Sequence, residues 1–177
     1  LKRWARQTGD FPFAGDLVIV IAMDYASKMT YLFESDLPNH TPDGNKDTAL
    51  QLARDNLRAH SELVEIAPIH NTWQQIRFDQ TYDASWAVLF DEILPKLNLV
   101  GEPILALISR DRFLVADSNA PEDIADLKQF AAEQISQAPH ALSAQLYHYQ
   151  NGHIRLYESL QWAWSPLRWP YRLSYRG

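Results

Sequence analysis

The stretch Tyr147-His148-Tyr149-Gln150-Asn151-Gly152-His153-Ile154-Arg155-Leu156 predicts a β-hairpin more clearly than any other part of the chain. Asn-Gly between two alternating runs is the strongest short-range hairpin signal, because both residues tolerate the positive φ of a type I′ turn. A two-residue turn pairs Gln150 with His153 and Tyr147 with Leu156. One face then points to the core (Tyr147, Tyr149, Ile154, Leu156) and the other to solvent (His148, Gln150, His153, Arg155).

Apolar runs upstream predict further hairpins. Leu17–Met23 is apolar at every position and rich in β-branched residues, which is the pattern of a strand covered on both faces. The charged corner Arg110-Asp111 separates two more apolar runs and favours a tight turn between them. The extended segments are expected to pair as 17–23 with 29–33, 64–69 with 73–79, and 103–109 with 113–116.

Helices are predicted between these hairpins from apolar residues at helical spacing. Asp47 and Asp83 are suited to cap the first two helices, and Pro121 to stand in the first turn of the third. Pro95 and Pro139 end the second and third, since proline cannot continue a helix. The expected buried stripes are Leu50, Ala53 and Leu57, then Trp86, Leu89, Phe90 and Ile93, then Ile124, Leu127, Ala131 and Ile135.

This order of elements predicts an α+β fold in which β-hairpins alternate with helices. We expect a largely antiparallel or mixed sheet with the helices packed on it. The 177 residues are enough to bury a core, and no shift in composition divides them, so residues 1–177 are expected to form a single domain. Residues 161–177 form an aromatic, arginine-containing C-terminal segment.

The composition excludes some classes of site and disfavours some partners. The chain has no cysteine, which excludes disulfides, cysteine-ligated zinc and a cysteine nucleophile. No signal-peptide pattern is seen, and the longest apolar stretch is too short for a membrane span, so we expect a cytoplasmic protein with no membrane partner. The net charge of −6 disfavours nucleic acid, since neutralised phosphates supply most of the affinity for it.

Metal and acid–base sites are weakly indicated. Only His148 and His153 are predicted to be close, and zinc needs three or four ligands, so no metal or cofactor is expected. Asp24, Asp111 and Asp117 fall at or near predicted strand ends, where carboxylates can hold a metal or divide acid and base roles. Nothing in the sequence brings these three together, and aspartate is also favoured in turns for its backbone hydrogen bonds.

The corner from Ser109 to Arg112 is a dense charged turn between two apolar strands. Arg110 is suited to bind an anion there, since guanidinium meets carboxylates and phosphates with two parallel hydrogen bonds. No glycine-rich phosphate loop or nucleophile elbow accompanies it. Turn charges that are simply solvated are the alternative.

The C-terminal segment mixes aromatic residues with arginines and contains no acid. Such mixtures make interface hot spots and stacking platforms for single-stranded nucleic acid. The alternative is that the segment wraps back on its own domain, with its tryptophans as anchors. The residues expected to bind a partner are Trp162, Trp164, Arg168 and Trp169, together with Arg110 and Asp111 of the corner.

Several short patterns lie between about residues 48 and 158. They are Ala49 with Asn56-Leu57, Ala84-Ser85, Arg110-Asp111, Leu142-Ser143, Leu146-Tyr147 and Gly152. Together they resemble a family of uncharacterised bacterial cytoplasmic proteins, the YtpQ-like family. The resemblance implies a bacterial α+β protein and transfers no activity, because that family has none established. The N-terminal part of the family and the aromatic tail do not match.

Three classes of function follow. The leading hypothesis is a non-catalytic protein-interaction domain, such as an adaptor or an immunity-type protein that neutralises a toxin, with a probable protein partner. The alternative is a hydrolase that uses strand-end carboxylates, with Arg110 as the anion site. Binding of single-stranded nucleic acid through the tail is a third possibility, which the net charge disfavours.

Overall fold

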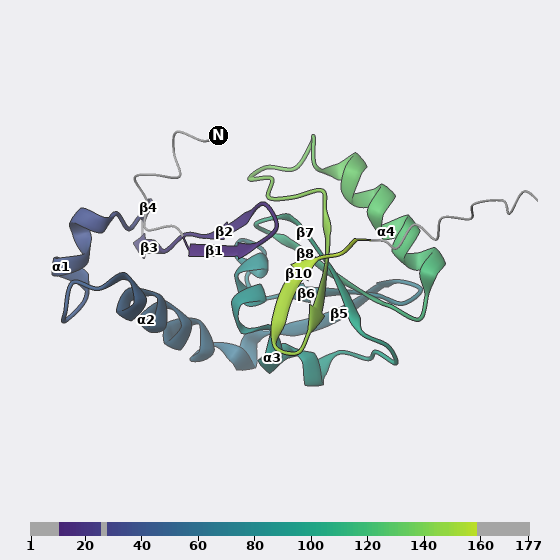
Figure 1. Cartoon of the computed structure of the whole chain (residues 1–177), viewed down its shortest axis with the longest axis horizontal. Coiled ribbons are helices and arrows are strands. Elements are labelled where there is room, and N and C mark those ends of the chain that lie inside the picture. Colours follow the sequence, from purple (N-terminus) through teal and green to yellow (C-terminus); the bar gives the residue numbers. More distant parts are fainter. Residues whose placement is uncertain (1–10, 26–27, 159–177) are drawn as a thin grey trace, which may run out of the picture.

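The computed structural model describes residues 11–25 and 28–158. Its main feature is a six-stranded antiparallel sheet of order β10-β9-β7-β8-β6-β5 (Figure 1), which confirms the predicted α+β class. The strands are β5 (Glu65–His70), β6 (Trp73–Arg77), β7 (Pro103–Ser109), β8 (Arg112–Asp117), β9 (Leu146–Gln150) and β10 (His153–Leu156).

β7 and β8 form the centre of the sheet and of the core. Every residue of β7 is buried, and in β8 only Arg112 is partly exposed. Successive side chains alternate between the two faces of the sheet. Leu105 and Leu107 therefore pack in one hydrophobic cluster, while Ile104 and Ala106 pack in another on the opposite face. Both faces of this sheet are covered.

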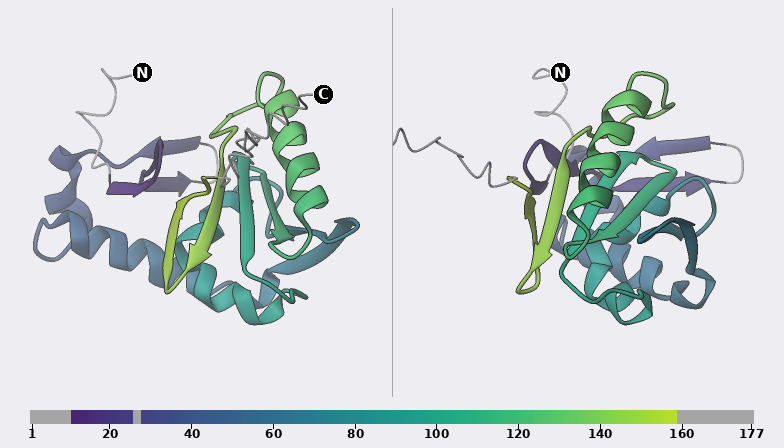
Figure 2. Two further views of the ribbon diagram at one scale, coloured as in Figure 1. Left: turned by 45° about the vertical axis from the view of Figure 1, so that its right-hand side comes forward. Right: turned by 90° about the vertical axis from the view of Figure 1, so that its right-hand side faces the viewer.

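The helices cover the two faces separately. On one face, α4 (Pro121–Gln134) buries Ile124, Leu127 and Ala131 against β7 and β8. On the other face lie η3 (Asp83–Leu89), α3 (Phe90–Ile93) and η4 (Leu94–Lys96), whose Trp86 and Phe90 reach the core. Figures 1 and 2 show α4 running along the sheet. The expectation of helices packed on a sheet is confirmed.

Asp123 fastens the first turn of α4 to the β5–β6 turn. Its carboxylate accepts hydrogen bonds from Thr72 Oγ1 at 2.5 Å, from the Thr72 backbone N–H at 3.1 Å and from Asn71 Nδ2 at 3.0 Å. The Thr72 hydroxyl, and then Asn71, hold the pKa of Asp123 below its ordinary value. A carboxylate in a first helical turn also complements the helix dipole.

The N-terminal part of the chain forms two separate two-stranded hairpins rather than strands of the main sheet. One hairpin pairs β1 (Phe11–Ala14) with β2 (Leu17–Ile19), and the other pairs β3 (Ala22–Tyr25) with β4 (Lys28–Tyr31). Four helical segments follow them: η1 (Glu34–Asp36), α1 (Leu37–His40), α2 (Lys46–Arg58) and η2 (Ser61–Leu63). In the right-hand view of Figure 2, the β3–β4 hairpin projects to one side of the sheet.

The β1–β2 turn is joined to the sheet by a buried polar contact. Tyr147 donates its hydroxyl to Asp16 Oδ1 at 2.5 Å, and Ser143 Oγ donates to the same carboxylate at 3.1 Å. Gly15 allows this approach, since it adopts a φ of +55° and a Cβ there would lie 3.3 Å from the Tyr147 ring. Burial, and then the Asp16 carboxylate, raises the pKa of Tyr147 far above its ordinary value.

The last hairpin agrees with its prediction residue for residue. Gln150 pairs with His153 and Tyr147 with Leu156, and both turn residues, Asn151 and Gly152, adopt positive φ. On the face predicted to meet solvent, Gln150, His153 and Arg155 are exposed, whereas His148 is half-buried. On the predicted core face, Leu156 stays 37% exposed. The 103–109 and 113–116 pairing and the helix that begins at Pro121 are also confirmed.

The prediction of one doubly covered strand over Leu17–Met23 is wrong. The run is divided between β2 and β3, and its side chains alternate strictly between half-buried and exposed. Two-stranded hairpins have only one face against the body of the protein, so a strand within them buries at most every second side chain. The strand that is covered on both faces is β7.

Two predicted helix caps are also wrong. Asn45, not Asp47, caps α2, because the Asn45 side chain accepts a hydrogen bond from the Asp47 backbone N–H at 2.8 Å. Asp83 is fully buried and accepts hydrogen bonds from the backbone N–H groups of Phe78 and Gln80, so it organises the preceding loop. Burial raises the pKa of Asp83.

Candidate functional site

The residues predicted to bind a partner fall into two groups. Trp162, Trp164, Arg168 and Trp169 lie outside the described residues. Arg110 and Asp111 form the turn between β7 and β8, at the end of the sheet where Ser109 faces Arg112. Of the two groups, only this corner lies within the described residues.

The backbone of Arg110 is held from both sides. Its N–H donates to the His140 carbonyl at 3.2 Å, and its own carbonyl accepts from the Ala84 N–H at 3.0 Å. The guanidinium lies over the Tyr82 ring, 5.0 Å from the centroid, and Nη1 is 3.9 Å from the sulfur of Met29. A cation over an aromatic face is attracted by the ring quadrupole, so the side chain is held in place without a carboxylate.

Asp111 has a different environment. Its carboxylate accepts a hydrogen bond from Ser109 Oγ at 2.6 Å across the turn. This hydroxyl, and to a lesser extent the charges of Arg112 and Arg110, lower the pKa of Asp111. Asp111 thus stabilises the turn, whereas Arg110 contacts a separate element, β4, through Met29.

Two of the three strand-end carboxylates, Asp111 and Asp117, lie at opposite ends of one strand. Asp111 precedes β8 and Asp117 ends it, so six extended residues, or about 20 Å at 3.3 Å per residue, separate them. Asp117 accepts hydrogen bonds from the backbone N–H groups of Val100, Gly101 and Asn119. Burial opposes these bonds, but together they lower the pKa of Asp117. A site that needs Asp111 and Asp117 together is therefore not formed.

The two histidines of the last hairpin form no metal site with their described neighbours. His148 and His153 lie diagonally across the β9–β10 pair, as the register predicts. Within residues 11–25 and 28–158, no group of three or more histidine, aspartate or glutamate side chains could hold a metal ion. The His148 ring lies edge-on to Tyr157, at 6.4 Å between centroids.

Arg110 stands at one end of an exposed apolar surface on the β3–β4 hairpin. Ala22 pairs with Tyr31 and Asp24 with Met29, and directly opposite residues share a face. The Leu32 N–H donates to the Ile21 carbonyl at 2.9 Å, so the alternation continues to Val20 and Phe33. We call Val20, Ala22, Tyr31 and Phe33 the outer hairpin face.

The two sides of this hairpin differ sharply in burial. On the inner side, Leu32 is buried and packs with Leu37 and Ala49, joined by half-buried Ile21 and Met23. On the outer hairpin face, Val20 is 37%, Tyr31 49% and Phe33 39% exposed. The outer hairpin face ends at Met29, whose sulfur accepts a hydrogen bond from the Tyr82 hydroxyl at 3.3 Å.

Three acidic residues lie next to the outer hairpin face. Asp24 lies beside Met29 on the same side of the hairpin, and Glu34 and Asp36 follow Phe33 in η1. Asp36 also accepts a hydrogen bond from the Phe33 backbone N–H at 3.1 Å. Asp24 pairs with Met29, whose sulfur accepts the Tyr82 hydroxyl, so Asp24 lies on the side of the hairpin that contacts Tyr82. Burial, and then the charge of Asp24, raises the pKa of Tyr82.

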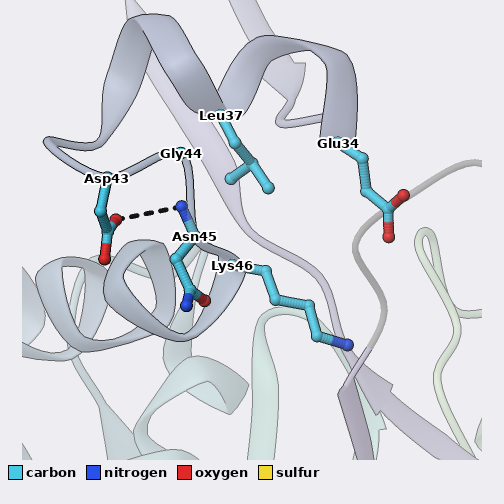
Figure 3. A pocket seen from close by; sticks show the side chains of 6 residues that line it. All are labelled: Glu34, Leu37, Asp43, Gly44, Asn45 and Lys46. Carbon is cyan, nitrogen blue, oxygen red and sulfur yellow. Dashed lines mark hydrogen bonds between the residues drawn. The ribbon is translucent and has the colours of Figure 1, made fainter.

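A shallow open hollow lies beside this surface, between α1 and the start of α2 (Figure 3). The polar side chains at the start of α2 already have partners. Asp43 accepts hydrogen bonds from the Asn45 backbone N–H and from Thr48, and Lys46 Nζ lies 5.3 Å from the centroid of the Phe11 ring. The hollow is lined by Glu34, Leu37, Asp43, Gly44, Asn45 and Lys46. Its polar groups serve mainly to begin α2.

The sequence did not reveal the outer hairpin face, because both sides of the hairpin are apolar. Alternation between apolar and polar residues reveals a half-exposed strand only where its exposed side is polar. Here Val18, Val20 and Ala22, on the exposed side, are as apolar as their inward neighbours. Asp24 was the one available signal, since a carboxylate interrupts the exposed side of the run. In the sequence, however, Asp24 is equally consistent with the end of a strand.

Comparison of the chain with protein-family models, with curated proteins and with solved structures gives no match. The resemblance to the YtpQ-like family therefore stays a prediction. In the described part of the chain, no helix is both long and apolar enough to cross a membrane.

Proposed function

We propose that this chain is a protein-interaction domain of the bacterial cytoplasm, an adaptor or immunity-type protein, and that it docks its partner on the outer hairpin face beside Arg110. One observation carries the proposal. Of eleven large hydrophobic residues that are exposed in the described structure, three, Val20, Tyr31 and Phe33, lie together on the outer hairpin face, and Val18 precedes them on β2. Exposed apolar residues gathered in one place are typical of protein-binding surfaces, whereas scattered ones need no explanation.

The residue types fit such a role. Tyrosine and arginine are enriched among the residues that dominate binding energy, and aromatic residues are enriched at interface cores. Tyr31 and Phe33 supply aromatic surface, and Arg110 supplies a guanidinium that has no ion-pair partner among the described residues. The Tyr82 ring and the backbone bonds of the corner already fix Arg110, so ordering it on binding costs little entropy.

The charges around the surface indicate the partner's chemistry. Residues 11–158 contain ten lysines and arginines and 21 aspartates and glutamates, a net charge of −11. Asp24, Glu34 and Asp36 rim the outer hairpin face itself. Complementary charge speeds encounter and suppresses wrong partners. The partner segment is therefore expected to be apolar or aromatic and basic.

Site-specific photo-crosslinking in living bacteria tests the proposal. A photoreactive phenylalanine at Tyr31 should capture one protein partner, identified by mass spectrometry. The same residue at Ala132, which is exposed on α4, should not capture it. Phe33→Ser should abolish the capture, and Arg110→Ala should weaken it by about tenfold or more, as loss of a hot-spot residue does.

The proposal fails if the Tyr31 and Ala132 probes capture the same proteins. It also fails if the captured protein still binds when both Tyr31 and Phe33 are serine in a chain whose circular dichroism spectrum is unchanged. If the captured partner segment is acidic, the outer hairpin face is still the docking surface, but the proposed basic character of the partner is wrong.

A further inference from the structure

The chain itself contains a segment with the chemistry that the outer hairpin face requires. Residues 159–177 contain three tryptophans, two tyrosines and three arginines, and no acidic residue. These residues have a net charge of +3, whereas residues 11–158 have a net charge of −11. A basic aromatic segment and an acid-rimmed apolar surface attract each other. When both are on one chain, the tether raises the local concentration of the segment to about the millimolar range, so even a weak attraction gives a large bound fraction.

The point where this segment begins lies at the correct end of the sheet. β10 ends at Leu156, opposite Tyr147, and the Tyr157 N–H donates to the Leu146 carbonyl. Leu146 pairs with Ala106, and β7 continues from there toward Ser109 and the Arg110 corner. The chain therefore leaves the sheet at the end that carries Arg110.

The segment is also long enough. Nineteen residues follow Glu158, and they span at most about 63–68 Å when fully extended. Six strands at about 4.8 Å spacing make a sheet only about 25–30 Å wide. The Arg110 corner, between β7 and β8, lies only two to three strand spacings from β10 and contacts Met29, where the outer hairpin face ends. The segment can therefore reach this face with more than half of its length remaining.

We propose that residues 159–177 dock on the outer hairpin face of their own chain and compete there with the partner. Their aromatic side chains cover Val20, Tyr31 and Phe33, and their arginines meet Asp24, Glu34 and Asp36. The competition rests on the proposed function, whereas the docking itself can be measured without any partner. A partner then binds by displacing a segment of its own chemical kind.

The absence of cysteine from the chain makes a direct test possible. Ala22→Cys with Ser174→Cys places one thiol on the outer hairpin face and one near the end of the segment, in the full chain. The matched control is Ala132→Cys with Ser174→Cys. Ala132 is also exposed and lies near Gln134, which accepts a hydrogen bond from Arg112 at the same end of the sheet.

Under mild oxidation, we expect an intramolecular disulfide to form about tenfold or more faster with Ala22→Cys than with Ala132→Cys, because docking raises the local thiol concentration. Tyr31→Ser and Phe33→Ser together should remove this difference. Raising the salt concentration to 1 M should reduce it several-fold, since exposed charge pairs are screened at that ionic strength. Disulfide-linked monomers and dimers separate on a non-reducing gel.

Three results would overturn the proposal. Equal rates for the two pairs would show that the segment does not prefer the face. Disulfide-linked dimers would assign the face to the segment of a second copy. A faster reaction of Ala22→Cys with Gln7→Cys than with Ser174→Cys would assign it to the N-terminal segment. If the photoreactive residue at Tyr31 still captures a partner in any of these cases, the docking surface stands and only its intramolecular occupant is wrong.

Discussion

Two hairpins of similar apolar composition have opposite environments in this molecule. β7–β8 is buried on both faces, and not one residue of its first strand is exposed. β3–β4 contains no fully buried residue in either strand. The Met29–Arg110 contact joins the two hairpins. Apolar residues in β7–β8 therefore hold the fold together, whereas those on the outer hairpin face contribute little to stability and remain available for binding.

The largest expected effect is at the centre of the sheet. Phe113→Ala removes a fully buried ring that packs against Phe90, with 6.0 Å between the ring centroids. The free energy of unfolding should fall by about 3–5 kcal/mol, from lost burial and from the cavity left behind. Urea denaturation followed by circular dichroism measures this. A loss below ~1 kcal/mol would contradict the assignment of β7–β8 as the core.

A smaller effect is expected at the other end of β8. Asp117→Asn removes a carboxylate that binds three backbone N–H groups of the loop before β7 and the turn after β8. The free energy of unfolding at pH 7 should fall by about 1–3 kcal/mol, as for loss of a charged hydrogen-bond acceptor.

The pH dependence should identify the same carboxylate. The folded pKa of Asp117 is below the ordinary 3.8, so its contribution is complete above that value and is lost as the pH falls through the folded pKa. The Asn variant should therefore lose less stability than the wild type between pH 5 and pH 2. Parallel acid titrations of the two proteins would disprove this role.

A still smaller loss of stability is expected where Tyr147 of the main sheet contacts Asp16 of the β1–β2 turn. Tyr147→Phe removes the hydroxyl that donates to Asp16 and should cost about 1 kcal/mol at pH 7. Because the folded pKa of Tyr147 is raised above 10, this contribution is complete below pH 10 and is lost as the pH rises above it, by up to about 1.4 kcal/mol per pH unit.

Chemical denaturation at pH 9 and pH 11 compares the wild type with Tyr147→Phe. Tyr149→Phe is the matched control, since burial and then Asp91 raise the pKa of Tyr149 to about 12 without any contact to the β1–β2 turn. If Tyr147→Phe retains the full alkaline loss of stability, Tyr147 is not the group that titrates.

The smallest effect on stability is expected on the outer hairpin face. Tyr31→Ser changes a side chain that is 49% exposed, and the free energy of unfolding should change by less than about 1 kcal/mol. Binding of the captured partner to the Tyr31→Ser chain should nevertheless be lost. A destabilisation as large as that of Phe113→Ala would show that both hairpins belong to the core, and the comparison above would no longer hold.

The sequence predicted the fold best where local signals and tertiary packing agree. Asn151-Gly152 determines both the turn and the register of its hairpin, and Pro121 with the Ile124 stripe determines α4. It failed where burial depends on elements far away in the chain. Leu17–Met23 and Pro103–Ser109 are both apolar runs, and only the surrounding structure decides which one is covered on both faces.

The candidate site was predicted only in part. Arg110 was recognised from its position in a charged corner, but its contacts with Tyr82 and Met29 join residues that are 28 and 81 positions away. Asp111 was paired with Arg110 by adjacency, although their side chains have separate contacts. The outer hairpin face arises from a register between two apolar strands, which composition alone does not reveal.

The two outermost strands of the main sheet affect how a partner can bind. One edge strand, β5, contains Pro68, which has no backbone N–H to donate, and its pairing with β6 is irregular between Pro68 and His70. The other, β10, is four residues long and exposes His153 and Arg155. Short, charged or proline-containing edges resist the addition of a further strand. Recognition by this protein is therefore expected to depend on side-chain contacts and not on extension of its sheet by a partner's backbone.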